Sequence, residues 1–181
     1  MVRRILPSEK HWQADSDSSL KTNKRRFSLN IHPDHIKQVL NQLLNDKTIA
    51  SHLISIKVTE KKKTAITRSD NIIIFFYDKQ DSTEILKKQL IPYKKYTRPS
   101  HPPMMEPIDD TIQGIAFADL TINRANAGSW GLTRIKPISE ALWGLKTIGK
   151  EITSNNLLEA VEERFRWRDI DPKHPQWDLH N

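Results

Sequence analysis

One lysine of this sequence has neighbours that suit a catalytic base. Lys57 stands between Ile56 and Val58 in an alternating segment, where it is expected to share a face with Leu53 and Ser55. If that face lines a partly desolvated cleft, burial favours the neutral amine, which can take a proton from a substrate. The same spacing fits a lysine of an edge strand that points into water. The local sequence leaves both interpretations open.

Two other segments contain arginines that could bind an anion. Arg68-Ser69-Asp70 precedes a long apolar segment, and its carboxylate can orient its guanidinium through paired hydrogen bonds. Gly128-Ser129-Trp130-Gly131 is followed by Arg134, so the backbone N–H groups of the turn and a fixed guanidinium could face the same anion. The alternatives are an ordinary surface ion pair for the first segment and a plain helix-capping turn for the second.

Other classes of catalytic or cofactor site are not indicated. The sequence has no cysteine, which excludes a thiolate nucleophile and a disulfide framework and agrees with a reducing compartment. Its seven histidines show no zinc-like spacing. Neither a nucleophile elbow nor a phosphate-binding glycine-rich loop is present. We therefore expect neither a metal nor an organic cofactor.

The chain is basic, with a formal net charge of +7. This excess favours an acidic partner such as nucleic acid, an anionic membrane face or a phosphorylated ligand, although net charge also serves solubility. The longest apolar run, residues 72–77, is far shorter than the roughly 20 residues of a membrane-spanning helix, so no membrane partner is expected. Nucleic acid is also disfavoured, because the one basic-aromatic cluster that could stack bases lacks a recognised motif. That cluster comprises Tyr93, Lys94, Lys95, Tyr96 and Arg98.

The apolar pattern predicts the elements that must position these residues. Residues 1–24 are polar, basic and without period, which predicts a disordered leader. Residues 25–178 are predicted to form a single α+β domain with a mostly antiparallel sheet and helices packed on one side. Strands are expected at 26–31, 52–59, 71–77 and 114–120, and helices at 33–44, 81–90 and 154–167.

Several local expectations are specific. Arg26 and Ser28 should share the polar face of the first strand, because the strand alternates with period two. Asp81 should cap the helix that follows it with its side chain. Residues 91–107 contain five prolines and should form a long loop of the kind that is often functional. Pro137 should lie in the first turn of a helix, where a missing N–H is tolerated.

Taken in chain order, these segments resemble the HopA-type family of type III secretion effectors, whose relatives include lyases of lanthipeptide biosynthesis. The resemblance covers about residues 25–178 and rests on the order and spacing of degenerate motifs. They are a first strand with its proline, a strand lysine, an Arg-x-Asp before an apolar strand, a glycine after the proline-rich loop, a turn that opens a helix, and an Ile-Asp-Pro ending. In this sequence they fall at 26–35, Lys57, 68–70, 114–118, 129–134 and 170–175.

That family is similar in turn to the phosphothreonine lyase effectors, which remove phosphate from a side chain by β-elimination. The resemblance implies that Lys57 is the base that takes the Cα proton. It further implies that Arg26, Arg68 and Arg134 bind the phosphate, with Asp70 and Ser129 in support, and that no cofactor is required.

The sequence departs from the family pattern at two positions. Ser28 stands where the phosphothreonine lyases have an acid histidine and HopA-type proteins usually have a tyrosine, and a serine hydroxyl is a poor acid at neutral pH. The arginines alone could assist the departure of phosphate, or His32, His35 or Tyr96 could supply a proton. Glu106 lies in a loop where the family tends toward a hydroxyl or basic residue, and its carboxylate would repel phosphate.

The predicted function is that of a type III effector-like protein that binds phosphorylated Ser or Thr in a peptide or protein and eliminates the phosphate. The alternative is a non-catalytic phosphopeptide-binding module that uses the same cationic cleft. A nucleic-acid-binding protein is the third and weakest hypothesis. Expected partners are the phosphorylated substrate and a secretion chaperone. The expected location is the cytoplasm of the producing cell and, after secretion, a host cell.

Overall fold

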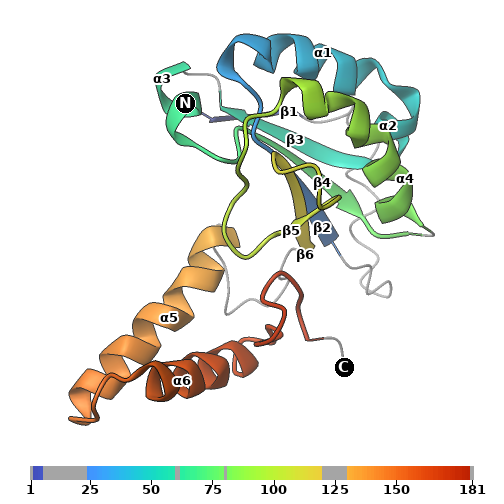
Figure 1. Ribbon diagram of the computed structural model, residues 1–181. Helices are drawn as coiled ribbons and strands as arrows, with labels where there is room; N and C mark the ends of the chain where they lie inside the picture. The colour runs from blue at the N-terminus through green and yellow to red at the C-terminus, as the bar shows by residue number, and fades with distance from the viewer. Residues whose placement is uncertain (1, 6–23, 60–61, 80, 120–129, 180–181) are drawn as a thin grey trace. The chain divides into compact units, whose positions relative to one another are not determined.

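The computed structural model describes residues 2–5, 24–59, 62–79, 81–119 and 130–179 (Figure 1). The chain divides into two compact units, Met1–Ala118 and Asp119–Asn181. The N-terminal unit carries the sheet and the shorter helices, and the C-terminal unit carries two longer helices. Within the described residues, no helix is long and apolar enough to cross a membrane.

The sheet has six strands in the order β1-β3-β4-β2-β6-β5. All four strand pairs with an assigned register, β1/β3, β3/β4, β2/β4 and β5/β6, are antiparallel, which confirms the predicted α+β class with a mostly antiparallel sheet. The apolar strand expected to be central is β4, which pairs on both of its edges. The strands are β1 Val2–Ile5, β2 Lys24–Leu29, β3 Leu53–Thr59, β4 Ile72–Tyr77, β5 Glu106–Pro107 and β6 Ile115–Asp119.

The longer helices of the N-terminal unit lie on one side of this sheet, as Figure 1 shows for α1, α2 and α4. The predicted helices at 33–44 and 81–90 are confirmed as η3 with α1, and as α4. The sequence pattern gave no indication of α2 or α3, which are too short for a helical period to show. The helices of this unit are η3 Pro33–His35, α1 Ile36–Asn45, α2 Lys47–His52, α3 Lys62–Thr67, α4 Ser82–Leu90 and η4 Ile91–Tyr96.

The core lies between these helices and one face of the sheet. Phe27 of β2 stacks on Phe76 of β4 with ring centroids 5.0 Å apart, and it also contacts the ring of Phe117 of β6 at 5.8 Å. All three rings are buried. Offset stacking adds to the burial of large apolar side chains. Because Phe27 points into the core, the alternation of β2 places Arg26 and Ser28 on the opposite, polar face of the sheet.

A bulge in β3 changes one predicted face. Leu53 pairs with Phe76, whereas Ser55 pairs with Phe75, so the register shifts between these two β3 residues. Phe76 belongs to the core face, and Leu53 is accordingly buried there instead of sharing the face of Lys57. The expectation for Leu53 is wrong because strict alternation takes no account of an inserted residue.

The structure corrects two expectations about the N-terminal unit. Val2–Ile5 forms strand β1 on the edge of β3, where a disordered leader was predicted. Residues 6–23 of that leader lie outside the described part of the chain. Asp81 occupies the N-cap position of α4, but it has a φ of 60° and its side chain makes no capping hydrogen bond. Its carboxylate therefore does not cap the helix as expected.

The proline-rich segment is more ordered than a loop. Residues Ile91–Tyr96 form the 3₁₀ helix η4, and Glu106–Pro107 form the short strand β5. The backbone N–H of His32 donates to the Tyr96 carbonyl, and the backbone N–H of Arg98 donates to the Asn30 carbonyl. These two bonds hold the segment to the end of β2. The sequence could not show these bonds because they join positions more than 60 residues apart.

The C-terminal unit contains α5 Trp130–Thr147 and α6 Ser154–Arg166. The predicted helix at 154–167 is confirmed, and the Thr153 hydroxyl caps it by accepting a hydrogen bond from the backbone N–H of Asn156 at 3.2 Å. Pro137 lies inside α5 and not in its first turn, so that expectation is wrong. Pro137 is buried with Ala141 on one face of the helix, where its ring adds apolar surface although it removes a backbone hydrogen bond.

Candidate functional site

The polar face of the N-terminal sheet is organised in two rows across β2, β4 and β3. Ser28 pairs with Ile73, and Ile73 pairs in turn with Lys57. Directly opposite residues of antiparallel strands project to the same side of the sheet. Ser28 and Lys57 therefore share this face, separated by two strand spacings of about 4.8 Å each.

The second row places Arg26 beside Ser28. Arg26 pairs with Phe75, and Phe75 pairs with Ser55, so all three project to the polar face. Only 5% of Arg26 is exposed, and Ser28 and Ser55 are completely buried. The Arg26 Nη2 donates to the Ser28 hydroxyl at 2.7 Å. The prediction that Arg26 and Ser28 share the polar face is confirmed.

Asp70 links the two arginines of the predicted phosphate site. Its Oδ1 accepts from Arg68 Nε at 2.9 Å and lies 2.7 Å from Arg68 Nη2, so one oxygen receives both arms of that guanidinium. Its Oδ2 lies 3.4 Å from Arg26 Nη2. The Arg68 side chain is 37% exposed, whereas that of Arg26 is 6% exposed. The expected orientation of Arg68 by Asp70 is thus present, and the same carboxylate also reaches Arg26.

Lys57 contributes a third cation to this face. It is half-buried, and within the described residues its amine makes no hydrogen bond or ion pair. Asp70 is a carboxylate that both arginines contact, and Lys57 adds an amine to the same face of the sheet. The face therefore combines fixed hydrogen-bond donors with an available amine, which is the composition that an oxyanion requires.

Arg98 supports the turn that carries Arg68. Its guanidinium donates to the backbone carbonyls of Ala65 at 2.9 Å, Ile66 at 2.6 Å and Arg68 at 2.6 Å, and also to the side-chain oxygen of Asn30. These bonds fasten the end of α3 and the Arg68 turn to the end of β2. A charged donor shared by several carbonyls makes a rigid support.

Asn30 and Gly114 complete this support. The Asn30 amide donates to the backbone carbonyl of Ser100 at 3.0 Å and to its hydroxyl at 2.9 Å, so the proline-rich segment lies against the Asn30 end of the polar face. The Gly114 carbonyl accepts from the backbone N–H of Asn30 at 2.8 Å, and Gly114 lies so close to Thr97 that a Cβ on it would collide. Sequence reasoning missed these supporting roles, although it had identified the proline-rich segment as a loop of the kind that is often functional.

The predicted site residue Arg134 belongs to the C-terminal unit. It is 1% exposed and donates to the Asp178 carboxylate at 2.8 Å, the Pro175 carbonyl at 2.9 Å and the Thr133 hydroxyl at 3.2 Å. Its guanidinium also lies over the Trp130 ring at 5.3 Å. Burial lowers the pKa of Arg134, and the nearby Asp178 carboxylate opposes that shift. These bonds hold α5 to the C-terminal segment. The proposed role of Arg134 in anion binding stays a prediction, and Ser129 lies outside the described residues.

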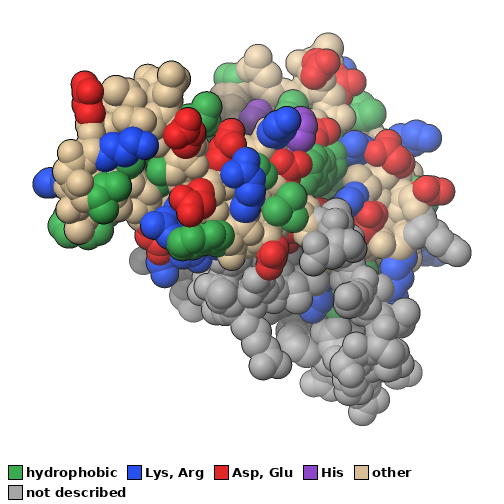
Figure 2. All heavy atoms as spheres, turned by 90° about the horizontal axis from the view of Figure 1, so that it is seen from below, with side chains coloured by type: hydrophobic (Ala, Val, Ile, Leu, Met, Phe, Trp, Pro, Cys, Tyr) green, Lys and Arg blue, Asp and Glu red, His purple; other side chains and the backbone are tan. Residues whose placement is uncertain are grey.

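The basic-aromatic cluster considered for nucleic acid is divided between the interior and the surface. Tyr93 is 7% exposed, and burial raises its pKa. The Arg98 guanidinium is occupied by backbone carbonyls. On the face that Figure 2 shows, Lys and Arg side chains are interspersed with Asp, Glu and hydrophobic ones. Tyr93 and Arg98 are therefore engaged within the N-terminal unit and are not presented for base stacking.

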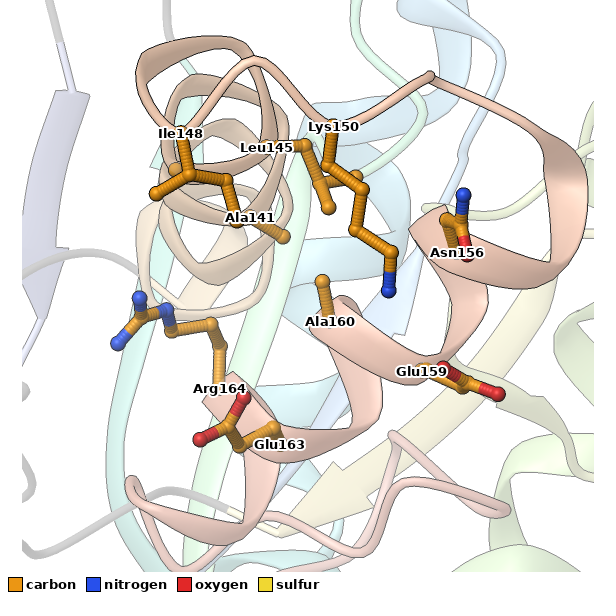
Figure 3. A pocket seen from close by; sticks show the side chains of 10 residues that line it. Ala141, Leu145, Ile148, Lys150, Asn156, Glu159, Ala160, Glu163 and Arg164 are labelled. Atoms are coloured by element: carbon orange, nitrogen blue, oxygen red, sulfur yellow. The ribbon is translucent and has the colours of Figure 1, made fainter.

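A hollow of about 270 Å³ lies between α5 and α6 (Figure 3). Its floor includes the small residues Ala141, Gly144 and Ala160. The charged side chains around it carry both signs, with Lys150 and Arg164 opposed by Glu159 and Glu163. Because these charges balance, the hollow is less suited to a phosphate than the sheet face.

A family model matches residues 13–177, most of this chain, and its description is the HopA1 effector protein family. The chain belongs to the HopA1 effector protein family. The resemblance stated from the motifs is thereby confirmed, and the matched range includes Lys57, Arg68 and Asp70. Members of this family are type III effectors.

Two solved structures of effectors support the same fold. The effector from Pseudomonas syringae pv. tomato strain DC3000 has a TM-score of 0.67 and 16% identity, and the effector from Pseudomonas syringae pv. syringae strain 61 has a TM-score of 0.64 and 14% identity. In both comparisons the match covers 99% of this chain and 63% of the other chain, so this HopA1-family chain spans less than two thirds of either effector. No curated protein sequence matches.

Proposed function

We propose that this HopA1-family effector binds phosphorylated Ser or Thr of a peptide or protein on the polar face of its N-terminal sheet and eliminates the phosphate. The supporting observation is the sharing of Asp70 by Arg26 and Arg68 on the face that also carries Lys57. Two guanidinium groups oriented by one carboxylate offer planar, paired donors to phosphate oxygens, and a lysine amine stands across the strands from them.

The elimination assigns a separate task to each cation. The neutral amine of Lys57 takes the Cα proton, the electrons of the Cα–H bond form a Cα=Cβ double bond, and the Cβ–O bond breaks. Phosphate leaves with the electrons of that bond, held by Arg26 and Arg68 as its charge develops. The products are a dehydroamino acid residue, phosphate and a protonated lysine, which returns its proton to solvent.

Ser28 decides between catalysis and binding alone. Its hydroxyl is completely buried and accepts the hydrogen bond from Arg26 Nη2. It therefore serves to position that guanidinium, and no strong acid stands at its place. If the substrate enters as the phosphate monoanion, the leaving group is already HPO₄²⁻ and needs no further proton. If it enters as the dianion, the arginines must stabilise the leaving group alone, and the non-catalytic binding module becomes the second candidate.

The first experiment is mass spectrometry of phosphothreonine and phosphoserine peptides incubated with the protein. We expect loss of the whole phosphoric acid, as elimination requires, and abolition of that loss in Lys57→Ala. Lys37→Ala, which removes a lysine from the surface of α1, is the matched control and should keep the activity. A net loss of HPO₃ alone would indicate hydrolysis and contradict the mechanism. Binding without turnover, weakened in Arg68→Ala, would establish the binding module instead.

The cellular setting follows from the family. A type III effector is delivered into host cells, and we propose the same for this chain. We further propose that its substrate is a phosphorylated host protein, and that a secretion chaperone binds it in the cytoplasm of the producing cell. Co-purification of the full chain with a chaperone before secretion, and its absence after delivery, would test the second of these proposals.

A further inference from the structure

Helix α5 is apolar on two opposite faces. One face is buried, and it includes Trp130, Pro137, Ala141 and Leu145. At 100° per residue, a second stripe of large apolar side chains lies on the opposite side. A helix that is apolar all round is normally covered on both sides. The second stripe, here called the outer face of α5, comprises Leu132, Ile135, Leu142 and Trp143.

The outer face is strongly exposed. Trp143 is 69% exposed, Leu132 60% and Ile135 56%, whereas a soluble surface rarely gathers such side chains within one stripe. The same stripe also carries two exposed polar residues, the small Ser139 and the long Lys146. This composition of an apolar centre and a polar margin is that of a protein–protein interface.

We propose that the outer face of α5 binds the same face of a second copy of this chain, with the two helices antiparallel about a two-fold axis at Ser139. A two-fold interface requires a patch that is complementary to itself. In such an antiparallel pair, residues equally far before and after Ser139 face each other, so Ile135 of one copy lies opposite Trp143 of the other. The small side chain at the axis lets the two helices approach closely there.

The charges of α5 are compatible with this pairing. Reflection about Ser139 places Lys136 opposite Leu142 and Lys146 opposite Leu132, so no lysine faces a lysine of the second copy. Lys146 already lies over the Trp143 ring at 5.8 Å and can extend its aliphatic stem over the apolar stripe. The one carboxylate of α5, Glu140, is held by Arg168 at 2.8 Å and lies beside the stripe, not within it.

The expected dimer is weak. The summed exposed area of the four apolar side chains is on the order of 500 Å² per copy, because a large side chain has a total area of roughly 150–250 Å². Two copies then bury about 1,000 Å², which is the lower limit for a specific interface. Such an association depends on protein concentration. Most of its binding free energy is expected to come from a central aromatic residue, here Trp143.

Sedimentation velocity of the full chain over a series of concentrations tests the proposal. We expect a monomer–dimer equilibrium whose dissociation constant rises by at least about 30-fold in Trp143→Glu, since the loss of a hot-spot residue has an effect of this size. Trp167→Glu is the matched control, because Trp167 is 66% exposed and lies under a cation, Arg164, at 4.4 Å, but belongs to the end of α6. The control should dimerise as the parent does.

A cysteine variant tests the register and does not depend on the folding of Trp143→Glu. The chain has no cysteine, so Ser139→Cys introduces a single thiol at the proposed axis. Mild oxidation should link two copies rapidly through this residue. Glu159→Cys, exposed on α6, should link slowly and only by random collision.

Three results would overturn the proposal. The parent chain could remain monomeric at all concentrations tested, the two cysteine variants could cross-link at equal rates, or dimerisation could be lost in Trp167→Glu and kept in Trp143→Glu. The first result would leave another protein, or another part of the same chain, as the occupant of the outer face. A concentration-dependent dimer that cross-links through Ser139→Cys would support it.

Discussion

The two compact units of this chain each contain a nearly buried arginine, and they use it differently. Arg26 of the N-terminal unit shares its carboxylate, Asp70, with a second guanidinium that is partly exposed. Arg134 of the C-terminal unit has Asp178 at 2.8 Å together with a carbonyl, a hydroxyl and an aromatic ring. The shared carboxylate joins Arg26 to a cation that reaches solvent, whereas these partners of Arg134 hold two segments of its own unit together.

The comparison teaches that residue type alone does not indicate a binding arginine. Both residues were assigned to phosphate from motifs, and both are buried. The difference lies in whether a neighbouring cation that shares the carboxylate reaches solvent. Arg68, at 37% exposure, gives the N-terminal site such a neighbour. Substitutions in the two units test whether the two arginines differ in this way.

The largest effect is expected from Arg134→Met. Removal of one partner of a buried ion pair leaves Asp178 uncompensated, which typically costs about 3–5 kcal/mol. We therefore expect the free energy of unfolding to fall by about that amount in chemical denaturation. Lys136→Met, on the exposed side of the same helix, should have almost no effect. If Arg134→Met were as stable as the parent and lost phosphopeptide binding, Arg134 would be a ligand residue and the comparison would fail.

Arg68→Ala should have a smaller effect, and this effect should be on affinity for the phosphopeptide and not on stability. The loss of a charge-assisted hydrogen bond to phosphate costs about 1.5–3 kcal/mol, so the dissociation constant for a phosphothreonine peptide should rise about 10- to 100-fold. Stability should change little because the side chain is partly exposed. Titration calorimetry and thermal unfolding measure the two quantities. Arg166→Ala, which removes an exposed arginine of α6, should leave the affinity unchanged.

The smallest effect on binding is expected from Arg98→Met. This residue acts through the Arg68 turn, so its loss should loosen the position of Arg68 and raise the dissociation constant by only about 3- to 10-fold, within the range of a single hydrogen bond. The decisive readout is a double-mutant cycle with Arg68→Ala, in which the two effects should not add. Lys94→Met, in the same segment, is the control. Additive effects would show that Arg98 does not position Arg68.

Much of the sheet could be predicted because its signals are local. The alternation of residues 26–31 and the apolar run at 72–77 indicated strands, and they placed Arg26 and Ser28 on one face, as the pairing of β2 with β4 confirms. The link between Arg68 and Asp70 joins residues two apart and was predicted for the same reason. The bulge at Leu53 and Ser55 was not, because it arises from the pairing of two strands.

The sequence by itself determined the fold class, the family, and the candidate cations, since period, spacing and motif order are properties of short segments. Only the tertiary structure decided that Arg26 and Arg68 share Asp70, that Arg98 fastens their turn, and that Arg134 is bound within its own unit. These outcomes depend on contacts between residues about 30 to 70 positions apart. Such contacts form when distant elements pack, and packing fixes which charges are neutralised and which stay available to a ligand.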